Sequence, residues 1–511
     1  MSHGEYAVGG LDPRLDDDSV LRELGYTPEL SRRMGGFGNF AISFSVISVL
    51  SGCMTLYGFG LGTGGPAVML WGWLAVGAMV MLVGAALAEV TSAYPTSGAL
   101  FDMAKKLGGP RWGWFTGWLN LLGLLGAIAG IDYGAATFCG AFADLQWGFA
   151  PSPSKTMVIY FVILAVHAGL NLFGVRLVTV LNSVSVWWHL GGVAVIVGAL
   201  VVVPTHHQSP HFMFTTFVNS TGWSSHWYVA LLGLLLAQYT FSGYDASAHL
   251  SEETVQARVA APRGIVRAIG WSWLAGFVLL AGLTFAIQDY SGTVGTSTGV
   301  PPAQIFIDAL GASGAKALLL IVIVAQLFCG NAEVAACSRM VYAFSRSRAL
   351  PGSALWRRVS ARTATPVPAV WLSVGVAGVL ALPALYSTVA YNAVTAINVI
   401  GITPAYAIPI YLRLRAGKHF TAGPWHLGRW SAPVGWIAVI WVGLVTVLFC
   451  LPQTRPAGHL VTVGSFNYAP IALAVVLVLA TVWWFIAGRR DYGAPVPAGR
   501  TGLDQYEDEV V

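Results

Sequence analysis

Residues 235–254 read LLAQYTFSGYDASAHLSEET, an apolar membrane-span sequence that is interrupted by Ser242-Gly243 and then by Asp245. Backbone polar groups in hydrocarbon must be satisfied within the protein, so such a break is tolerated only where it lines a polar cavity. A second apolar run carries a similar interruption, Val49-Leu50-Ser51-Gly52-Cys53-Met54-Thr55. Paired interrupted spans are the best sequence indication of a ligand site in a membrane transporter. We therefore predict that the two breaks meet near the middle of the membrane and form one site.

The composition indicates a protein that crosses the membrane many times. Of its 511 residues, 56% are hydrophobic and 10% are charged, whereas about a quarter of the residues in soluble domains are charged. An apolar run of about 20 residues is long enough to cross the hydrocarbon core as a helix. We therefore predict an all-α integral membrane protein of about 12 transmembrane helices. They lie near 38–62, 67–92, 113–142, 156–174, 180–203, 227–249, 265–287, 315–341, 367–385, 388–412, 432–451 and 467–487.

The basic residues indicate the orientation of the chain. Of the 27 Lys and Arg, all but Lys155, Lys316 and Arg455 fall in one set of loops and ends. Positive charge marks the cytoplasmic side, so we expect a multi-pass protein of the cytoplasmic membrane with both termini in the cytoplasm. The net charge of +5 then reflects topology and not nucleic-acid binding. Residues 1–36 are polar and acidic, unlike a signal peptide, and are expected to be a cytoplasmic tail.

The two interrupted runs divide the chain into two halves. They are the first and the sixth of the predicted spans, and five spans per half reverse the orientation of the second half. Two inverted repeats of this kind place their broken spans side by side. We predict a membrane domain over 37–490, with repeat one at about 38–203, repeat two at about 227–412, extra helices at about 432–487, and a cytoplasmic tail at 491–511.

Glycines at the two breaks allow the backbone to leave the helical path. A short helix beginning near Cys53 is expected to point free N–H groups and a positive dipole end at a ligand carboxylate. Carbonyl groups around Thr240 and Phe241 are expected to face a ligand ammonium. The alternative is that Gly52 and Gly243 only permit close helix packing. Two Ser-Gly breaks at matching places favour the binding site.

Ionisable side chains inside the spans are candidates for coupling or gating, because they are costly there and commonly functional. Asp245 can gate, bind a cation or take up a proton, or it can cap the resumed helix. Asp132 is expected to face the cavity or the external mouth, where it is either functional or an interfacial cap. Glu333 suits a proton carrier or a cation partner, unless it pairs with a polar neighbour. His189 is a natural proton carrier, although a lone buried histidine is more often a packing residue, which is our expectation for His167.

The loop after the sixth span, Ser251-Glu252-Glu253-Thr254, is expected to be a cytoplasmic gate or hinge. In it, Glu252 or Glu253 is expected to pair with Arg263 or Arg267. The five cysteines lack metal-ligand spacing and no nucleophile–base constellation appears. We therefore expect no metal, no cofactor and no catalytic residues, and hence no enzyme.

Several motifs resemble those of the amino acid–polyamine–organocation superfamily of permeases, and most closely its amino acid/choline transporter family. The resemblance covers most of residues 21–490, and its motifs are specific for the family but not for one substrate. They are LYGFG (56–60) with GGP (64–66), AEVTSAYPTSG (88–98), GIDYG (130–134), SEET (251–254) with APRGI (261–265), and SRMVYAFSR (338–346).

The resemblance implies a LeuT-like fold of five plus five spans with two appended, and a ligand held at the breaks in spans 1 and 6 with help from spans 3 and 8. It places His189 where proton-coupled relatives carry a lysine, and Asp245 where relatives carry an acid linked to gating. Ser347-Arg348 departs from the family's acid-Gly pair, and Glu333 matches no family position. The predicted substrate-binding residues are Ser51, Gly52, Cys53, Thr55, Asp132, Phe241, Ser242, Gly243, Tyr244 and Asn331, and the predicted coupling or gating residues are His189, Asp245 and Glu333.

We expect a secondary active transporter that imports an amino acid or a related amine such as γ-aminobutyrate, by proton symport with alternating access. The expected partners are this small molecule, H⁺ and the lipid bilayer. The alternatives are uptake of a choline- or ethanolamine-type amine, which would rely on the rings of Phe241 and Tyr244 by cation–π contact, and exchange of substrate for product. A different class of protein, a non-transporting nutrient receptor or a channel, is the remaining alternative.

Overall fold

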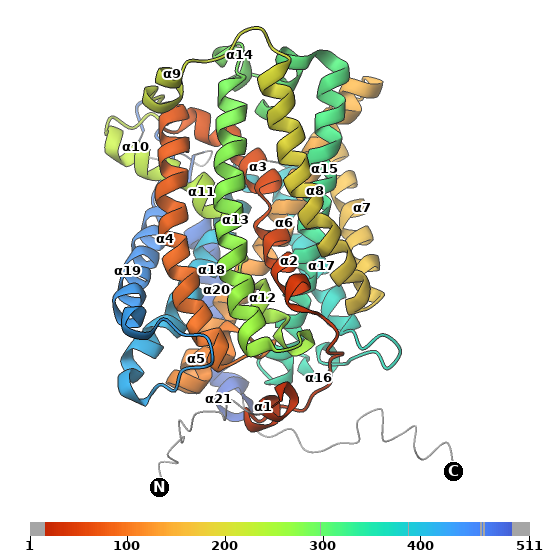
Figure 1. Cartoon of the computed structure of the whole chain (residues 1–511), viewed down its shortest axis with the longest axis vertical. Coiled ribbons are helices and arrows are strands. Elements are labelled where there is room, and N and C mark those ends of the chain that lie inside the picture. The colour runs from red at the N-terminus through yellow and green to blue at the C-terminus, as the bar shows by residue number, and fades with distance from the viewer. Residues whose placement is uncertain (1–15, 297, 387, 460–461, 463–464, 493–511) are drawn as a thin grey trace.

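The computed structural model describes residues 16–296, 298–386, 388–459, 462 and 465–492. In this part of the chain the fold is a bundle of long helices (Figure 1) without a β-strand. Eleven helices in it are long and apolar enough to cross a membrane. The predicted all-α membrane class is therefore confirmed.

The eleven long helices account for all but one of the predicted spans. The first is interrupted and consists of α2 (Gly36–Ile47) and α3 (Val49–Gly62). The others are α4 (Gly65–Ala93), α6 (Pro110–Trp147), α7 (Pro153–Leu172), α8 (Val175–Val202), α13 (Ala257–Phe285), α15 (Pro301–Arg346), α17 (Val367–Ala381) with the 3₁₀ turn Leu382–Leu385, α18 (Thr388–Ala416), α19 (Ser431–Cys450) and α20 (Ala469–Trp483).

The apolar run predicted near 227–249 is divided into three short helices. These are α10 (His226–Gly233), α11 (Leu235–Thr240) and α12 (Ala246–His249). At 1.5 Å per residue, none of them reaches across the roughly 30 Å of hydrocarbon by itself. This interrupted segment is the sixth predicted span.

Short helices lie at the two ends of the bundle. One end, which we call the α1 end, holds α1 (Asp17–Glu23), α5 (Leu100–Gly108), α16 (Ser353–Trp356) and α21 (Arg489–Asp491) (Figure 1). The opposite end holds α9 (Pro210–Thr215) and α14 (Tyr290–Val294). The first and last described helices thus lie at the same end, as an even number of crossings requires.

Helix α15 contains one non-helical residue, Gly311, at φ 69° and ψ 177°. Glycine adopts a positive φ without a steric penalty. The residues before Gly311 form a separate stretch of helix, and those after it form the span that we predicted to begin near residue 315.

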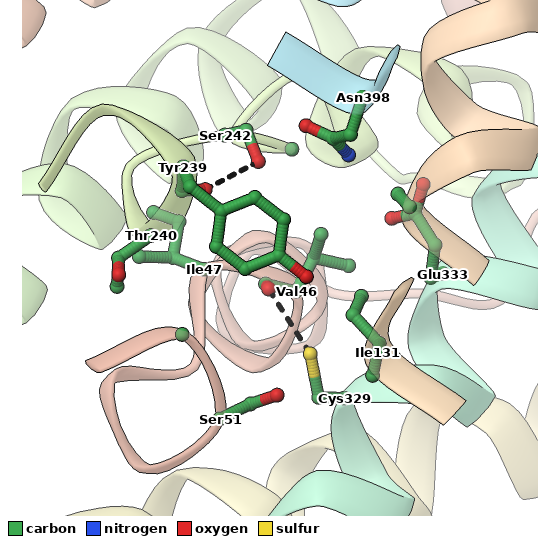
Figure 2. A pocket seen from close by; sticks show the side chains of 13 residues that line it. Val46, Ile47, Ser51, Ile131, Tyr239, Thr240, Ser242, Cys329, Glu333 and Asn398 are labelled. Carbon is green, nitrogen blue, oxygen red and sulfur yellow. Dashed lines mark hydrogen bonds between the residues drawn. The ribbon is translucent and has the colours of Figure 1, made fainter. Parts of the chain in front are cut away.

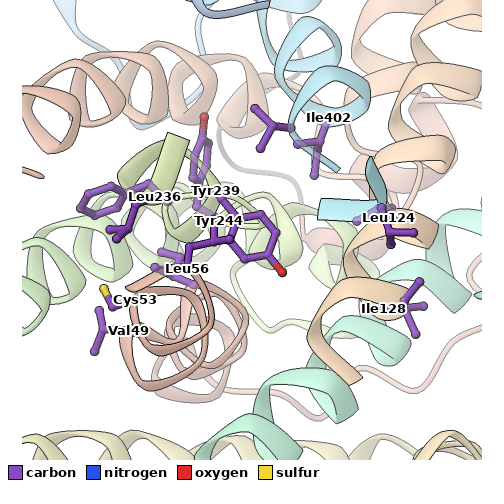
Figure 3. Close-up of a cluster of buried hydrophobic side chains, with 14 of the residues drawn as sticks. Val49, Cys53, Leu56, Leu124, Ile128, Leu236, Tyr239, Tyr244 and Ile402 are labelled. Carbon is purple, nitrogen blue, oxygen red and sulfur yellow. The ribbon is translucent and has the colours of Figure 1, made fainter. Parts of the chain in front are cut away.

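An apolar core surrounds the two interrupted spans (Figure 3). Val49, Cys53 and Leu56 of α3 and Leu236 of α11 are buried in it. Such packing fixes the short helices, which have too few residues to be stable alone. The core therefore holds both breaks in place and leaves their backbone groups available.

Candidate functional site

The first interrupted span bends at Ser48, between α2 and α3. Ser48 is left-handed (φ 34°, ψ 85°), which is costly for a residue other than glycine. Its Oγ lies 2.7 Å from Nε2 of His189 on α8, and this contact holds the turn. Our prediction placed the interruption at Ser51-Gly52 and the new helix near Cys53. That prediction was wrong, because α3 already begins at Val49.

Gly52 allows the two broken spans to approach each other and does not itself make the break. The amide nitrogens of Ser51 and Gly52 both donate to the carbonyl of Ser48, at 2.8 and 2.9 Å, so both residues belong to the first turn of α3. A Cβ added at Gly52 would lie 2.5 Å from Oγ1 of Thr240 on α11. The absent side chain therefore lets α3 touch the second broken span.

The second interrupted span breaks where the sequence predicts it. No helix covers residues 241–245, and Gly243 has a φ of 82°, which glycine adopts freely. Its N–H donates to Oη of Tyr406 on α18, at 3.0 Å. A Cβ at Gly243 would overlap the side chain of Val46 on α2. The glycine therefore permits the turn and also brings it against the end of α2.

The two breaks meet, as predicted, and border a cavity shared with α6, α15 and α18 (Figure 2). At the first break, the N–H groups of Val49 and Leu50 make no hydrogen bond with described residues. At the second, the same holds for the carbonyl groups of Thr240, Phe241 and Ser242. The lining residues are Val46, Ile47, Ser51, Gly52, Ala127, Ile131, Tyr239, Thr240, Ser242, Gly243, Cys329, Glu333 and Asn398.

Glu333 is the one acidic or basic side chain among these lining residues. It is fully buried, and neither carboxyl oxygen has a hydrogen-bond partner in the described part of the chain. A Cβ at Gly243 would lie 3.7 Å from its Oε2, and Figure 2 shows Glu333 across the cavity from Ser51 and Thr240. An ionised carboxylate buried without a partner is costly. This side of the cavity is therefore suited to a group that supplies a proton or a positive charge.

Cys329 and Asn398 also line the cavity, and our sequence analysis did not single them out. Sγ of Cys329 donates to the carbonyl of Val46, at 3.2 Å, which is one of the carbonyls that α2 leaves unpaired at its end. Nδ2 of Asn398 donates to the carbonyl of Gly123, at 3.4 Å. An asparagine within an apolar span was a usable signal. Cys329 gave none, because a buried cysteine usually behaves as a small apolar residue.

Four predicted substrate-binding residues line the cavity, namely Ser51, Gly52, Ser242 and Gly243. The predicted aromatic residues at the second break do not. The ring of Phe241 packs against Trp73 on α4, with centroids 4.4 Å apart, and that of Tyr244 stacks on Tyr406 at 4.5 Å. Both rings anchor the break in the protein core.

Cys53 and Thr55 are also absent from the cavity lining. Successive residues of a helix are rotated by about 100° about its axis. The face of α3 that carries Ser51 and Gly52 therefore cannot also carry both Cys53 and Thr55. Cys53 is buried in the apolar core. Oγ1 of Thr55 is buried and has no hydrogen-bond partner among the described residues.

Asp132 and Asn331 lie between neighbouring helices and not at the cavity. Oδ2 of Asp132 on α6 is 3.1 Å from Nδ1 of His167 on α7, and both side chains are buried. The carbonyl and Oδ1 of Asn331 on α15 accept from Nδ2 of Asn171 on α7, at 3.2 and 3.0 Å. His167, which we expected to be a packing residue, therefore has an acidic partner.

His189 and Asp245 lie at the two breaks without lining the cavity. Nδ1 of His189 is 2.8 Å from the carbonyl of Ser185, so it carries the hydrogen, and Nε2 accepts from Ser48. Asp245 accepts from Oη of Tyr406 at 2.8 Å. Its side chain makes no capping hydrogen bond to α12, so the structure does not support the alternative that it only caps the resumed helix.

The prediction that Glu252 or Glu253, in the loop after the second break, pairs with Arg263 or Arg267 was wrong. Glu252 pairs with Arg346, with Oε1 and Nη2 2.7 Å apart, and Glu253 pairs with Arg339 at 3.0 Å. Both arginines lie on α15, about 90 residues away in sequence, whereas Arg263 is exposed. These two pairs link the loop to α15 at the α1 end.

The N-terminal segment covers this loop. Oη of Tyr26 donates to Asp102 on α5, and its ring lies 4.4 Å from the guanidinium of Arg346. Burial, together with the carboxylate of Asp102, raises the pKa of Tyr26 well above its ordinary value. The carboxylate of Asp17 accepts from the backbone N–H groups of Gln256 and Ala257, where α13 begins. The segment is therefore attached to α5, α13 and α15 at the α1 end of the bundle.

Comparisons with known proteins agree with this arrangement. A family model described as "Amino acid permease" matches residues 34–479. The protein named Amino-acid permease BAT1 from Arabidopsis thaliana is 39% identical over 506 residues, which cover 95% of this chain and 97% of that protein. Its homolog from Oryza sativa subsp. japonica is 40% identical over 505 residues, 95% of each chain. The GABA-specific permease of Saccharomyces cerevisiae is 28% identical over 509 residues, which cover 97% of this chain and 88% of that protein.

These matches span nearly the whole length of the chain, and they point to a transporter rather than an enzyme. The long apolar helices agree with a protein that crosses the membrane many times. The chain belongs to the amino acid permease family of the amino acid–polyamine–organocation superfamily, and its family transports amino acids across membranes.

Proposed function

We propose that this permease imports an amino acid or a related amine such as γ-aminobutyrate across the cytoplasmic membrane by proton symport. The observation that carries the proposal is the cavity at the two breaks, with N–H groups at one break and carbonyl groups at the other that have no hydrogen-bond partner among the described residues. A zwitterion needs both kinds of partner. The name of the yeast relative, a GABA-specific permease, supports an amine substrate.

The proposed ligand lies with its carboxylate toward the start of α3 and its ammonium toward Glu333 and the second break beside Gly243. The N-terminal end of a helix carries a positive partial charge that favours an anion. The carbonyl groups of the second break, at Thr240, Phe241 and Ser242, have no partner in the described part of the chain. They and the carboxyl group of Glu333 are acceptors for an ammonium. None of the described residues that line the cavity is basic, so the N-terminal end of α3 is the group there that complements a ligand carboxylate.

Alternating access is proposed to occur by rocking of the two broken spans against the rest of the bundle. Their halves at the α1 end are tied together, since Oγ of Ser43 on α2 donates to the carbonyl of Tyr244 at 2.6 Å and lies 2.7 Å from Oγ of Ser247 on α12. Nδ2 of Asn39 donates to the carbonyl of Ser247 at 2.9 Å. These contacts support movement of α2 and α12 as one unit. The inverted repeats proposed over 38–203 and 227–412 each begin with a broken span.

Proton coupling is proposed to involve His189 and Asp245. Protonation of His189 would turn Nε2 from an acceptor into a donor at Ser48, the residue whose turn makes the first break. Asp245 lies at the end of the second break. A proton at either position would therefore change the hydrogen bonds that hold the cavity walls.

Uptake by the purified protein in liposomes tests this proposal. The substrates are radiolabelled γ-aminobutyrate, choline, ethanolamine and the common amino acids. Each is tested with an exterior that is more acidic than, more alkaline than or at the same pH as the interior of the liposomes. We expect accumulation of at least one amino acid or ω-amino acid that an acidic exterior increases. Uptake that requires substrate inside the liposomes and does not depend on the pH gradient would show exchange and contradict proton symport. Binding without accumulation would contradict transport altogether.

A further inference from the structure

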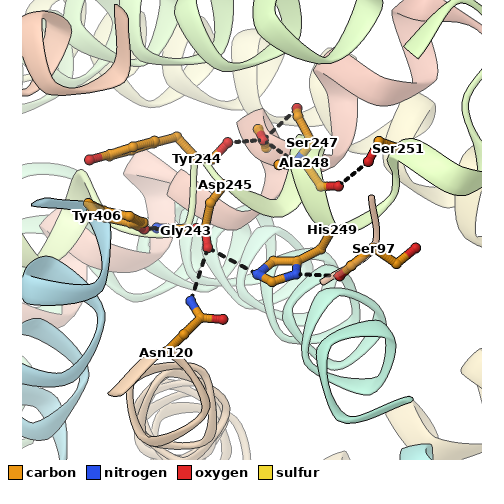
Figure 4. Close-up of polar contacts among 11 residues, drawn as sticks. Ser97, Asn120, Gly243, Tyr244, Asp245, Ser247, Ala248, His249, Ser251 and Tyr406 are labelled. Carbon is orange, nitrogen blue, oxygen red and sulfur yellow. Dashed lines mark hydrogen bonds and ion pairs between the residues drawn. The ribbon is translucent and has the colours of Figure 1, made fainter. Parts of the chain in front are cut away.

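His249, the last residue of α12, makes two hydrogen bonds that together need one more proton than a neutral histidine and an ionised aspartate carry. It is fully buried. Its Nδ1 lies 3.0 Å from the carbonyl of Ser97, and its Nε2 lies 3.1 Å from Oδ2 of Asp245 (Figure 4). A backbone carbonyl only accepts, so Nδ1 carries a hydrogen. A neutral imidazole has a single N–H, so the contact with Asp245 requires one more proton, on His249 or on Asp245.

The other two histidines buried in the described spans do not have this requirement. Nε2 of His189 faces the hydroxyl of Ser48, which donates. Nε2 of His167 has no hydrogen-bond partner among the described residues, and its Nδ1 donates to Asp132. The contacts of both are therefore compatible with a neutral imidazole. The geometry around His249 is therefore a specific feature and not a general property of buried histidines in this protein.

The groups around the pair donate hydrogen bonds to the carboxyl oxygens of Asp245. Nδ2 of Asn120 on α6 donates to Oδ2 of Asp245 at 3.3 Å, and Oη of Tyr406 on α18 donates to Oδ1 at 2.8 Å. The other titratable groups near Asp245 in the described part of the chain include Tyr406 itself, Tyr244, which stacks on it, and Glu333 on α15, which lies beside Gly243. No lysine or arginine hydrogen bond or ion pair to Asp245 or His249 occurs among the described residues. The additional proton of the pair, on His249 or on Asp245, is thus what compensates the negative charge of this carboxylate.

Ser97 connects the pair to the ion pairs of the α1 end. Its carbonyl accepts from His249, and its N–H donates to Oε1 of Glu252 at 2.9 Å. Oε1 of Glu252 also pairs with Arg346, at 2.7 Å. The backbone of Ser97 therefore joins His249, after the second break, to the ion pair between Glu252 and Arg346 that ties the loop 251–254 to α15.

We propose that Asp245 and His249 form a proton-binding site whose proton holds the α1 end closed. On release, the proton leaves the pair for water at the α1 end, and the pair becomes an aspartate beside a neutral imidazole. If Nδ1 keeps its hydrogen, Nε2 and Oδ2 are two acceptors facing each other. If the hydrogen moves to Nε2, the bond to Ser97 is lost. Either loss loosens the link between Asp245 and Glu252. The link to transport rests on the proposed proton coupling.

Spectroscopy tests the proton site without any assumption about transport. Solid-state NMR of nitrogen-15-labelled histidine in liposomes at neutral pH reports doubly protonated imidazole, and infrared difference spectra report a protonated carboxyl group. We expect one such signal in the natural protein that is lost in His249→Gln or in Asp245→Asn. The same signal should persist in His189→Gln and His167→Gln. A spectrum with neither signal would overturn the site.

Transport assays test what the proton does. In liposomes, we expect His249→Gln to retain exchange of labelled for unlabelled substrate at equal pH and to lose accumulation driven by a pH gradient. His167→Gln, also buried beside an aspartate, is the matched control and should retain both. Full pH-driven accumulation by His249→Gln would overturn the role of the proton. Failure of the natural protein to transport any amino acid would contradict the proposed function and leave the spectroscopic result standing.

Discussion

A Cβ on Gly52 would come within 2.5 Å of Oγ1 of Thr240, so the two broken spans touch at a point that admits no side chain. Gly52 belongs to the first turn of α3, and Thr240 ends α11. The contact fixes the distance between the N–H groups of one break and the carbonyl groups of the other. This distance is what a zwitterion bound between the breaks has to match.

Gly52→Ala should reduce substrate uptake. Overpacking of this kind costs about 1–3 kcal/mol, and about 1.4 kcal/mol corresponds to a tenfold change. We expect uptake to fall by about tenfold or more at equal amounts of protein in the membrane. The control is Gly191→Ala on α8, where an added Cβ meets nothing within 4 Å. Equal uptake by the two variants would mean that the contact does not shape the site.

Glu333→Gln should change which substrates are accepted. A hydrogen bond to a charged group contributes about 1.5–3 kcal/mol. The affinity for substrates whose ammonium reaches Glu333 should therefore fall about tenfold or more. In a competition assay, we expect the affinity for γ-aminobutyrate and lysine to fall more than the affinity for alanine. Asp308→Asn, which changes an exposed acid in the stretch of α15 before Gly311, should leave the ratios unchanged. An equal loss for all three substrates would assign Glu333 to the transport cycle and not to specificity.

His189→Ala should weaken coupling to the pH gradient. It removes the titratable ring that faces Ser48, and the left-handed turn then lacks its partner. We expect pH-driven accumulation to fall while exchange at equal pH persists, measured side by side in liposomes. Retention of full accumulation would make His189 a structural support of the turn.

Arg339→Met should destabilise the protein, because it leaves Glu253 buried without its partner. Both side chains are 0% exposed, and breaking a buried ion pair on one side costs about 3–5 kcal/mol. The loss of stability is measured by heating the protein in detergent and monitoring its unfolding by size-exclusion chromatography. Arg267→Met is the control, since the sequence suggested Arg267 as a partner but the residue is exposed. A larger loss in the Arg267 variant would contradict the observed pairing.

The sequence was sufficient for the spans and for the second break. Length and hydropathy decide which runs cross a membrane, and the positive φ of Gly243 is a conformation for which glycine is the expected residue. Gly52 was misinterpreted because a glycine needed for close approach looks the same in sequence as one needed for a turn. The first break lies instead at Ser48, and a serine turn that depends on His189, 141 residues away, has no local signature.

Contacts between distant segments explain the other differences. The partners of Glu252 and Glu253 lie on α15, and nearby arginines in sequence were the only guide to them. The ring of Tyr244 was expected at the ligand, but it stacks on Tyr406, because an aromatic side chain beside a break can serve either the ligand or the core. Helix periodicity alone does not distinguish these two uses.

The most direct test of the account is a cryo-electron microscopy map of the protein in the presence of a saturating amino acid that it transports. We predict density for the ligand between the start of α3 and the carbonyl groups of Thr240 and Phe241, next to Glu333. Helices α2 and α3 should be separated at Ser48, and α11 and α12 at Gly243. A continuous helix through either position, or a ligand bound elsewhere, would contradict the account.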